Sequence, residues 1–454
     1  MIRQTILDFK IERTEERLTA HGGLALLAEY NHGMGLQQLS DQHLPAPGSN
    51  RGYAPSAFVE SLVLLLQGGG QTLEDLRELE QEAALMELVG REVIPDPDTL
   101  GDWLRSACAL HADRRMGDSQ TDPAGLPGLG RVRDLLNHRL LRHDGISEYT
   151  LDADAIQIEA GKQEAHWTYQ GVKGYMPLLG FLFETPICLQ EEFREGNVSP
   201  GSDQVDFYRR CQARMPSGKR IAFYRADSAS YQAELINALE ADGVFWALTA
   251  DQDRTVKEAI QSIPESEWEE PTVGCGYEVA ETVHTMARTA HAFRLIVKRE
   301  LRRQTDLFAE DGYFHHAVAS NWPTEQKSAL QVLEWQNQRG QAENFLKELK
   351  GGLGLDRMPC GQSFANAVFF RLGVIAYNLF LGFKRLSCPE AFWHHTIATF
   401  RWKLIQVAGR IVHHAGQVVL PACALHADRK LVLDAEKLRL FRSIRKWCLE
   451  LAVT

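Results

Sequence analysis

The sequence predicts an α/β protein in which a mixed sheet carries helices on its faces and lies between helical segments. Three observations predict this fold class. Apolar residues recur at helical spacing between Gly and Pro turns over residues 1–110. Short alternating segments rich in β-branched and aromatic residues follow from Ser147, and helical periodicity returns after Pro323. A length of 454 residues suits two or three structural units.

Composition excludes several classes of protein. With 44% hydrophobic and 24% charged residues, the chain is neither disordered nor fibrous. Its longest aliphatic run, residues 62–66, is far shorter than the ~20 apolar residues of a membrane span. The first residues mix both charges without an apolar stretch, so we expect a cytoplasmic protein without a membrane partner. Eight cysteines without a Cys-x-x-Cys pair indicate neither a disulfide framework nor a zinc ribbon.

Charge is distributed unevenly along the chain. The formal net charge is -11, yet the segment from Arg339 to the C-terminus has 17 Lys and Arg against 8 Asp and Glu. The preceding residues have 32 against 52. Such asymmetry points to a nucleic-acid surface on the basic side, and an ordinary basic helical tail explains it equally well.

The helical N-terminal domain, residues 1–110, is predicted to bind DNA or to mediate dimerisation. Ser56 and Thr72 are expected to cap two helices, and a third follows Asp96. Three short helices with Gly and Pro turns resemble a helix-turn-helix, although plain three-helix packing fits as well and the segment is acidic. Residues 111–146 are predicted to form a linker and a connecting helix.

The predicted sheet occupies the middle of the chain. Residues 147–260 read as strands, a helix, a strand and another helix, which suits a mixed sheet. Residues 261–325 are predicted to be a β-rich insertion. Residues 326–385 return to the first unit with a long helix, and residues 386–454 form a helical C-terminal region.

Acidic side chains at predicted strand ends are candidate metal ligands. Asp152 and Asp154 alternate with apolar residues and project from one face of a strand, and Asp227 ends a later strand. With Glu343 on the long helix, these carboxylates suit a pocket for two divalent cations in phosphoryl transfer. Asp227 is equally suited to cap the helix that follows it.

Glu343 lies among cations at helical spacing. Arg339, Glu343, Lys347 and Lys350 are four, four and three positions apart and are predicted to share one helix face. A carboxylate in this setting can ligate a metal while its neighbours bind DNA phosphates. A solvent-exposed face with ion pairs has the same pattern.

Several motifs resemble bacterial insertion-sequence DDE transposases, in the branch described as transposase DDE domain group 1, which is related to the hairpin-forming insertion-sequence transposases. The resemblance covers nearly the whole chain and rests on LDADA, GKQE, YMPLLGF, YRADSASY, ASN and QNQRGQAENFLKELK. The family signature on the last segment is Tyr, two residues, Arg, three residues, Glu, six residues, Lys. Arg339, Glu343 and Lys350 fit it, whereas Gln336 replaces the Tyr and Ile156 replaces a Thr that usually follows the first acid.

The resemblance implies an RNase H-like catalytic core with a β-rich insertion between the second Asp and the Glu. It implies Asp154, Asp227 and Glu343 as catalytic ligands of two Mg²⁺ ions, with Mn²⁺ as a substitute and Asp152 as the rival first ligand. Arg339, Lys347 and Lys350 are then expected to contact DNA phosphates, and Arg225 to neutralise the acidic pocket. Trp322 is a candidate to stack on a flipped base, with core packing as its alternative.

We therefore expect a DNA transposase that cleaves at the ends of its own insertion sequence and joins them to target DNA. Its expected partners are double-stranded DNA, as terminal inverted repeats and as target, and a second copy of the chain in a synaptic homodimer. The alternatives are an RNase H-like nuclease without strand joining and a non-catalytic DNA-binding descendant.

Overall fold

The computed structural model describes residues 11–47, 52–91, 94–109, 127–301, 312–413 and 429–453. Most of the predicted linker, residues 111–126, lies outside them. The described helices are α1 Leu24–Gly33, α2 Leu36–His43, α3 Pro55–Gly68, α4 Leu76–Gln81, α5 Ala83–Leu88, α6 Pro97–Ala109, α7 Pro127–Leu141, α8 Gln204–Ala213, α9 Ala233–Ala241, α10 Arg254–Gln261, α11 Ala329–Asn337, α12 Gly340–Lys347, α13 Ser363–Leu386, α14 Ile397–Phe400 and α15 Ala435–Val453.

The strands belong to one large sheet and two small ones. The described strands are β1 Leu18–Thr19, β2 Glu148–Ala155, β3 Ile158–Glu159, β4 His166–Trp167, β5 Lys173–Tyr175, β6 Leu178–Leu182, β7 Cys188–Glu192, β8 Arg220–Ala226, β9 Phe245–Thr249, β10 Tyr277–His284, β11 Phe293–Leu301, β12 Tyr313–Ser320, β13 Gly409–His413 and β14 Arg429–Val432. The α/β class predicted from the sequence is confirmed.

The large sheet has the strand order β10-β11-β12-β9-β8-β2-β6-β7. Strand β2 is parallel to β8, and β8 is parallel to β9, whereas β6 and β7 form an antiparallel hairpin beside β2. Strands β10, β11 and β12, which fall in the predicted insertion, continue this sheet because β12 pairs antiparallel with β9. The chain between Asp227 and Glu343 therefore extends the sheet that holds the first acids.

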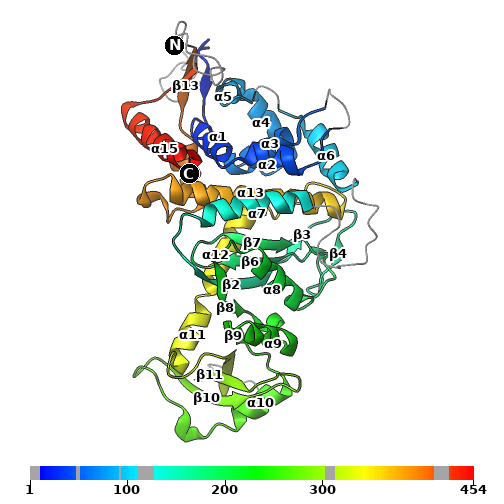
Figure 1. Ribbon diagram of the computed structural model, residues 1–454, viewed down its shortest axis with the longest axis vertical. Coiled ribbons are helices and arrows are strands. Elements are labelled where there is room, and N and C mark those ends of the chain that lie inside the picture. Colours follow the sequence, from blue (N-terminus) through cyan, green and yellow to red (C-terminus); the bar gives the residue numbers. More distant parts are fainter. Residues whose placement is uncertain are drawn as a thin grey trace, which may run out of the picture.

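Helix α13 is the central element of the molecule. Figure 1 shows it between the N-terminal helices and the large sheet, with α7 beside it. It contacts α3, α6, α7 and β7. Its length and apolar composition would suffice to cross a membrane, but 94% of its most apolar window is buried inside the protein. Its apolar character is accounted for by packing on all sides.

Helix starts in the N-terminal region partly follow the predicted capping residues. Thr72 forms the predicted capping box with Asp75. The predicted Ser56 cap is wrong, because Pro55 starts α3 one residue earlier and Ala54 is the N-cap. The Ser56 hydroxyl instead donates a hydrogen bond to Asp41 at 2.9 Å.

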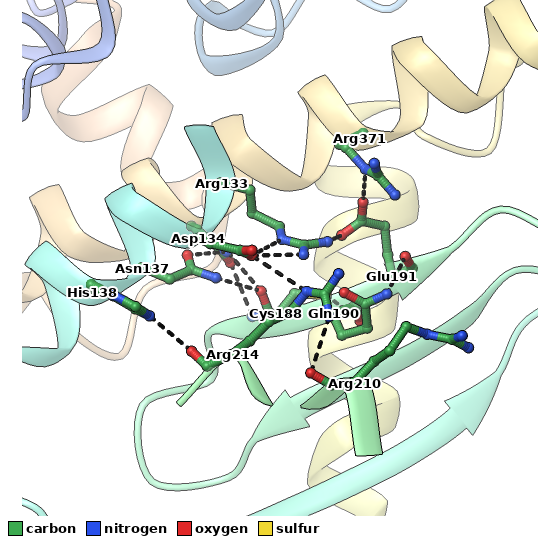
Figure 2. A network of polar contacts seen from close by, with 11 residues as sticks. Arg133, Asp134, Asn137, His138, Cys188, Gln190, Glu191, Arg210, Arg214 and Arg371 are labelled. Atoms are coloured by element: carbon green, nitrogen blue, oxygen red, sulfur yellow. Dashed lines mark hydrogen bonds and ion pairs between the residues drawn. The ribbon is translucent and has the colours of Figure 1, made fainter. Parts of the chain in front are cut away.

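A buried ionic network fixes β7 under the helical layer. In Figure 2, Arg133 from α7 and Arg371 from α13 reach the Glu191 carboxylate from two sides. All three side chains are at most 3% exposed. Arg133 also pairs with Asp134 at 2.7 Å. Because both arginines share one carboxylate, Glu191 links the sheet to two helices at once.

Asparagine side chains make a second link at the same place. The Asn378 side chain of α13 accepts a hydrogen bond from the Cys188 backbone amide at 3.0 Å and donates one to the Cys188 carbonyl at 2.8 Å. It also donates to Asn137 of α7 at 2.9 Å. These contacts satisfy backbone groups of β7 that no further strand pairs in the described sheet.

Arg401 joins the N-terminal helices to the C-terminal part of the chain. It begins a π-helical turn, η6 Arg401–Ile405, and its guanidinium donates to the carbonyls of Leu66 and Gln67 at the end of α3. It also donates to Gly352 at 2.6 Å. Burial lowers the pKa of Arg401 to about 10, and Glu348 opposes this shift. Arg401 thus satisfies carbonyl groups at the ends of two helical segments, where carbonyl groups generally have no partner within their own helix.

Replacing Arg401 by Met is expected to lower the free energy of unfolding by about 2 kcal/mol, because buried carbonyl groups lose their donors. Urea denaturation of the full chain measures this change. Arg410→Met is the matched control, since Arg410 forms an exposed ion pair with Glu16 and should cost less than about 1 kcal/mol. Equal effects of the two substitutions would show that the Arg401 contacts add no stability.

Candidate active site

The C-terminal ends of β2 and β8 bring two acids to one edge of the sheet. In the parallel register of these strands, Ala153 lies opposite Ala226. The residue that follows each of these alanines is an acid. Asp154 is the second-last residue of β2, and Asp227 comes directly after β8. Carboxyl ends of parallel strands are the usual location of ligand sites in such sheets. One Asp227 carboxylate oxygen accepts a hydrogen bond from the Ala229 amide at 3.0 Å, so Asp227 also caps the turn that follows it.

Glu343 lies close enough to Asp154 to affect its ionisation. It lies in the first turn of α12 with its side chain exposed. Burial raises the pKa of Asp154 to about 6; the Arg339 guanidinium opposes this shift, and the negative charges of Asp227 and Glu343 add to it. The two other predicted acids therefore both act on Asp154 through their charge.

Arg339 neutralises Asp154 in this structure. Its guanidinium lies 3.1 Å from the Asp154 carboxylate, and both side chains are mostly buried. No three His, Cys, Asp or Glu side chains within the described ranges are close enough together to hold a metal ion. The three predicted acids thus lie within electrostatic reach of one another, with Arg339 paired to Asp154, and do not close around a common centre in the described part of the chain.

Asp152 has a different environment from Asp154. It is fully buried, and Arg225 binds its two carboxylate oxygens at 2.7 and 2.8 Å. The guanidinium of Arg225 stacks on the ring of Phe183 at 4.3 Å. Burial raises the pKa of Asp152, and Arg225 opposes the shift. Arg225 was predicted to neutralise the acidic pocket. In the structure it pairs with Asp152.

Arg225 and Gln336 anchor the segment before Glu343 to the strand ends, a role that was not predicted for either residue from the sequence. Arg225 also donates to the Trp335 carbonyl at 2.7 Å and so satisfies the end of α11. Gln336, at the position of the family Tyr, is buried and donates to the Ala226 carbonyl at 2.8 Å. This bond holds α11 next to the residue that precedes Asp227. The departure of Gln336 from the family signature was the one available signal.

The predicted common face of Arg339, Glu343, Lys347 and Lys350 is interrupted. The helix breaks between α11 and α12, so that Arg339 is the N-cap of α12. Lys350 lies in a π-helical turn, η4 Glu348–Gly352, and donates to the Gln157 carbonyl at 2.9 Å. Lys347 is exposed. Of the three predicted phosphate-binding cations, Arg339 and Lys350 hold protein groups in this structure.

Trp322 is not a surface aromatic. It is 8% exposed and stacks on Phe245, with ring centroids 4.2 Å apart, and on Phe223 at 5.7 Å. Trp335 meets its edge. The expectation that Trp322 stacks on a DNA base is therefore corrected to core packing between β8, β9 and α11, because leaving this stack would expose a buried apolar cluster.

Acidic side chains at the ends of parallel strands, next to arginine and lysine, define a class: α/β enzymes that handle phosphate groups with divalent metals. The family model described as transposase DDE domain group 1 matches residues 7–443, and the chain belongs to this family. It is a DDE transposase, an enzyme that acts on DNA, and its family uses divalent metal ions.

Among curated proteins, none matches the sequence. Among solved structures, the chain is similar to the piggyBac transposase in a cryo-EM structure of its synaptic complex with hairpin DNA, with a TM-score of 0.45 and 9% sequence identity. The match covers 96% of this chain and 80% of that chain.

Proposed function

We propose that this transposase cleaves DNA at the ends of its own insertion sequence and joins those ends to target DNA, with Asp154, Asp227 and Glu343 as its catalytic acids. The observation that carries the proposal is the register of β2 and β8, which places Asp154 and Asp227 at adjacent strand ends within electrostatic reach of Glu343. Asp154 is favoured over Asp152 because Arg225 already occupies both carboxylate oxygens of Asp152.

The three acids suit a hard divalent cation. Carboxylate oxygens are the donors that Mg²⁺ and Mn²⁺ prefer. Burial raises the pKa of Asp154 to about 6, and the negative charges of Asp227 and Glu343 add to this shift. We propose two Mg²⁺ ions, which would activate the attacking oxygen and stabilise the leaving oxygen. Arg339 now provides the positive charge next to Asp154. We propose that it moves to a DNA phosphate when metal ions and DNA bind.

An RNase H-like core is proposed for strands β7, β6, β2, β8 and β9. A central strand with an antiparallel hairpin on one side and two parallel strands on the other supports this assignment. In this proposal β10, β11 and β12 are the insertion. We propose the same boundaries for the N-terminal helices, the core and the C-terminal region as those predicted from the sequence, although the C-terminal region predicted as helical also contains β13 and β14.

The proposed partners are double-stranded DNA and a second copy of the chain. Terminal inverted repeats and target DNA both have to reach the acids, and two transposon ends are brought together by a synaptic homodimer. Lys347, which is exposed one helical turn beyond Glu343, is proposed to bind a phosphate next to the scissile bond. We propose that the enzyme works in the cytoplasm.

Incubating the purified full-length protein with DNA from its element's ends tests the proposed function. Mg²⁺ is expected to give cleaved and joined products on a gel, and EDTA is expected to remove both, because the acids act through metal. Metal-dependent cuts without joining would instead indicate a nuclease. Binding without any cut would indicate a non-catalytic descendant, and cleavage in EDTA would contradict the metal assignment.

A further inference from the structure

The π-helical turn η6 exposes a tryptophan that the fold does not use. Trp402 is 76% exposed, although Leu404 and Ile405 of the same turn are buried. Arg401, directly before it, points inward to the end of α3. Trp393 is also 39% exposed. Large exposed aromatic side chains that do not support the core are characteristic of binding surfaces.

Lysine side chains lie in the same segments as these tryptophans and next to His395. The Lys403 ammonium lies 2.9 Å from the Nε2 atom of His395, and Lys384 donates to the His395 carbonyl at 2.8 Å. Lys437 of α15 donates to the Lys403 carbonyl at 3.3 Å. We call Trp393, His394, His395, Trp402, Lys403 and Lys437 the Trp402 surface. Its two lysines come from two elements, Lys403 from η6 and Lys437 from α15.

His395 lies close to several basic groups of this surface and its surroundings. Desolvation lowers the pKa of His395, and Lys403, Lys384 and His394 lower it further. The chain from Arg339 onward has 17 Lys and Arg against 8 Asp and Glu, so the surface lies in the basic part of an otherwise acidic protein. Positive charge interleaved with exposed aromatic rings is complementary to a nucleic-acid backbone and its bases.

The Trp402 surface is directly connected to the helix of Glu343. Helix α12 continues into η4, where the Glu348 carboxylate accepts a hydrogen bond from the Ile397 amide at 2.6 Å. The Arg401 guanidinium donates to the Gly352 carbonyl of the same turn. Nine residues separate Glu343 from Gly352, which is about 14 Å along a helix. Duplex DNA held at Glu343 is long enough to continue over this distance.

We infer that the Trp402 surface binds the duplex DNA whose end lies at the Asp154, Asp227 and Glu343 site, with Lys403 on a phosphate and Trp402 against a sugar or an exposed base. This inference rests on the proposed function for the position of the DNA end. Neither residue belongs to the catalytic acids, so their role is to hold DNA.

Fluorescence anisotropy with the full-length protein and a labelled duplex from its element's end, without divalent metal, tests the inference. Lys403→Gln is expected to weaken binding about threefold to tenfold and to lower the slope of log affinity against log salt by about one. Trp402→Ala is expected to weaken binding about tenfold, and Trp402→Phe is expected to restore most of it. Lys257→Gln is the matched control, because Lys257 is an exposed lysine on α10.

The salt slope separates a phosphate contact from a structural role, because a folding defect does not remove one released counterion. An unchanged affinity and slope in both Lys403→Gln and Trp402→Ala would overturn the inference, even if cleavage were normal. Weaker binding in both, with an unchanged Lys257→Gln control, would support it, even if the wild-type protein failed to cut. If Trp402→Ala folds poorly, the affinity of Trp402→Gln and the salt slope of Lys403→Gln are used in its place to test the inference.

Discussion

Replacing Glu343 by Gln is expected to lower the rate of DNA cleavage by more than about a thousandfold while DNA affinity stays within a few-fold. Glutamine has nearly the same shape but lacks the charge that a metal ligand needs. Glu343 is exposed at the start of α12 and has no described hydrogen bond, so the substitution should leave the fold intact. The gel assay with end DNA measures the rate, and anisotropy without metal measures binding.

Glu334→Gln is the matched control for this experiment. Glu334 is an exposed glutamate on α11, on the same stretch of chain as Glu343. It should cleave at the wild-type rate. If Glu343→Gln also cut at the wild-type rate, Glu343 would not be a metal ligand, and the assignment of the three acids would fail.

Replacing Glu191 by Ala is expected to lower the free energy of unfolding by about 3–5 kcal/mol. The substitution leaves Arg371 without the carboxylate that it shares and reduces the pairing of Arg133 to Asp134, in a place where both guanidinium groups are buried. Removing one partner of a buried ion pair costs this much because the interior cannot replace the lost hydration of the remaining charge. Figure 2 shows the contacts of Arg133 and Arg371 with Glu191, which the substitution would remove from both helices.

Urea denaturation measures this loss, with Glu148→Ala as the control. Glu148 pairs with Arg220 at 2.6 Å, but both side chains are about half exposed, so its removal should cost less than about 1 kcal/mol. A triple change of Glu191, Arg133 and Arg371 to apolar residues of similar size should recover much of the stability, since the three most deeply buried charges leave together and Asp134 keeps Arg214 at 3.5 Å. A small effect of Glu191→Ala alone would show that the network adds little.

Local patterns in the sequence were sufficient to predict the strands of the large sheet. Alternation in residues 149–156 and the hairpin of residues 175–196 correspond to β2, β6 and β7. These strands are buried on both faces, so the apolar segments bounded by turn residues were the useful signal. The pairing of β12 with β9 could not be predicted in this way. It depends on contacts such as those of Asn321, which bonds the Val244 carbonyl at 2.9 Å and the Trp246 amide at 2.8 Å.

The site was predictable in its residue types but not in its assignments. Asp152 and Asp154 have the same parity along β2, and the partner that distinguishes them, Arg225, is 73 positions away from Asp152. The continuous helix expected over Glu343 is divided because Arg225 and Gln336 tie the end of α11 to β8. Trp322 is equally aromatic on a surface or in a core, and its three ring neighbours decide between them.

The contact between β1 and β13 has a consequence for how the chain is made. Leu18 pairs with Arg410, so the two strands are separated by almost the entire length of the chain. During synthesis β1 therefore has no strand partner until β13 has left the ribosome. The carbonyl groups at the end of α3 likewise lack their Arg401 donor until that residue has been made. Ordering so large a loop is slow. We expect the helix of Glu343 to be synthesised well before the contacts that fix it, so that full folding is a late, post-translational event.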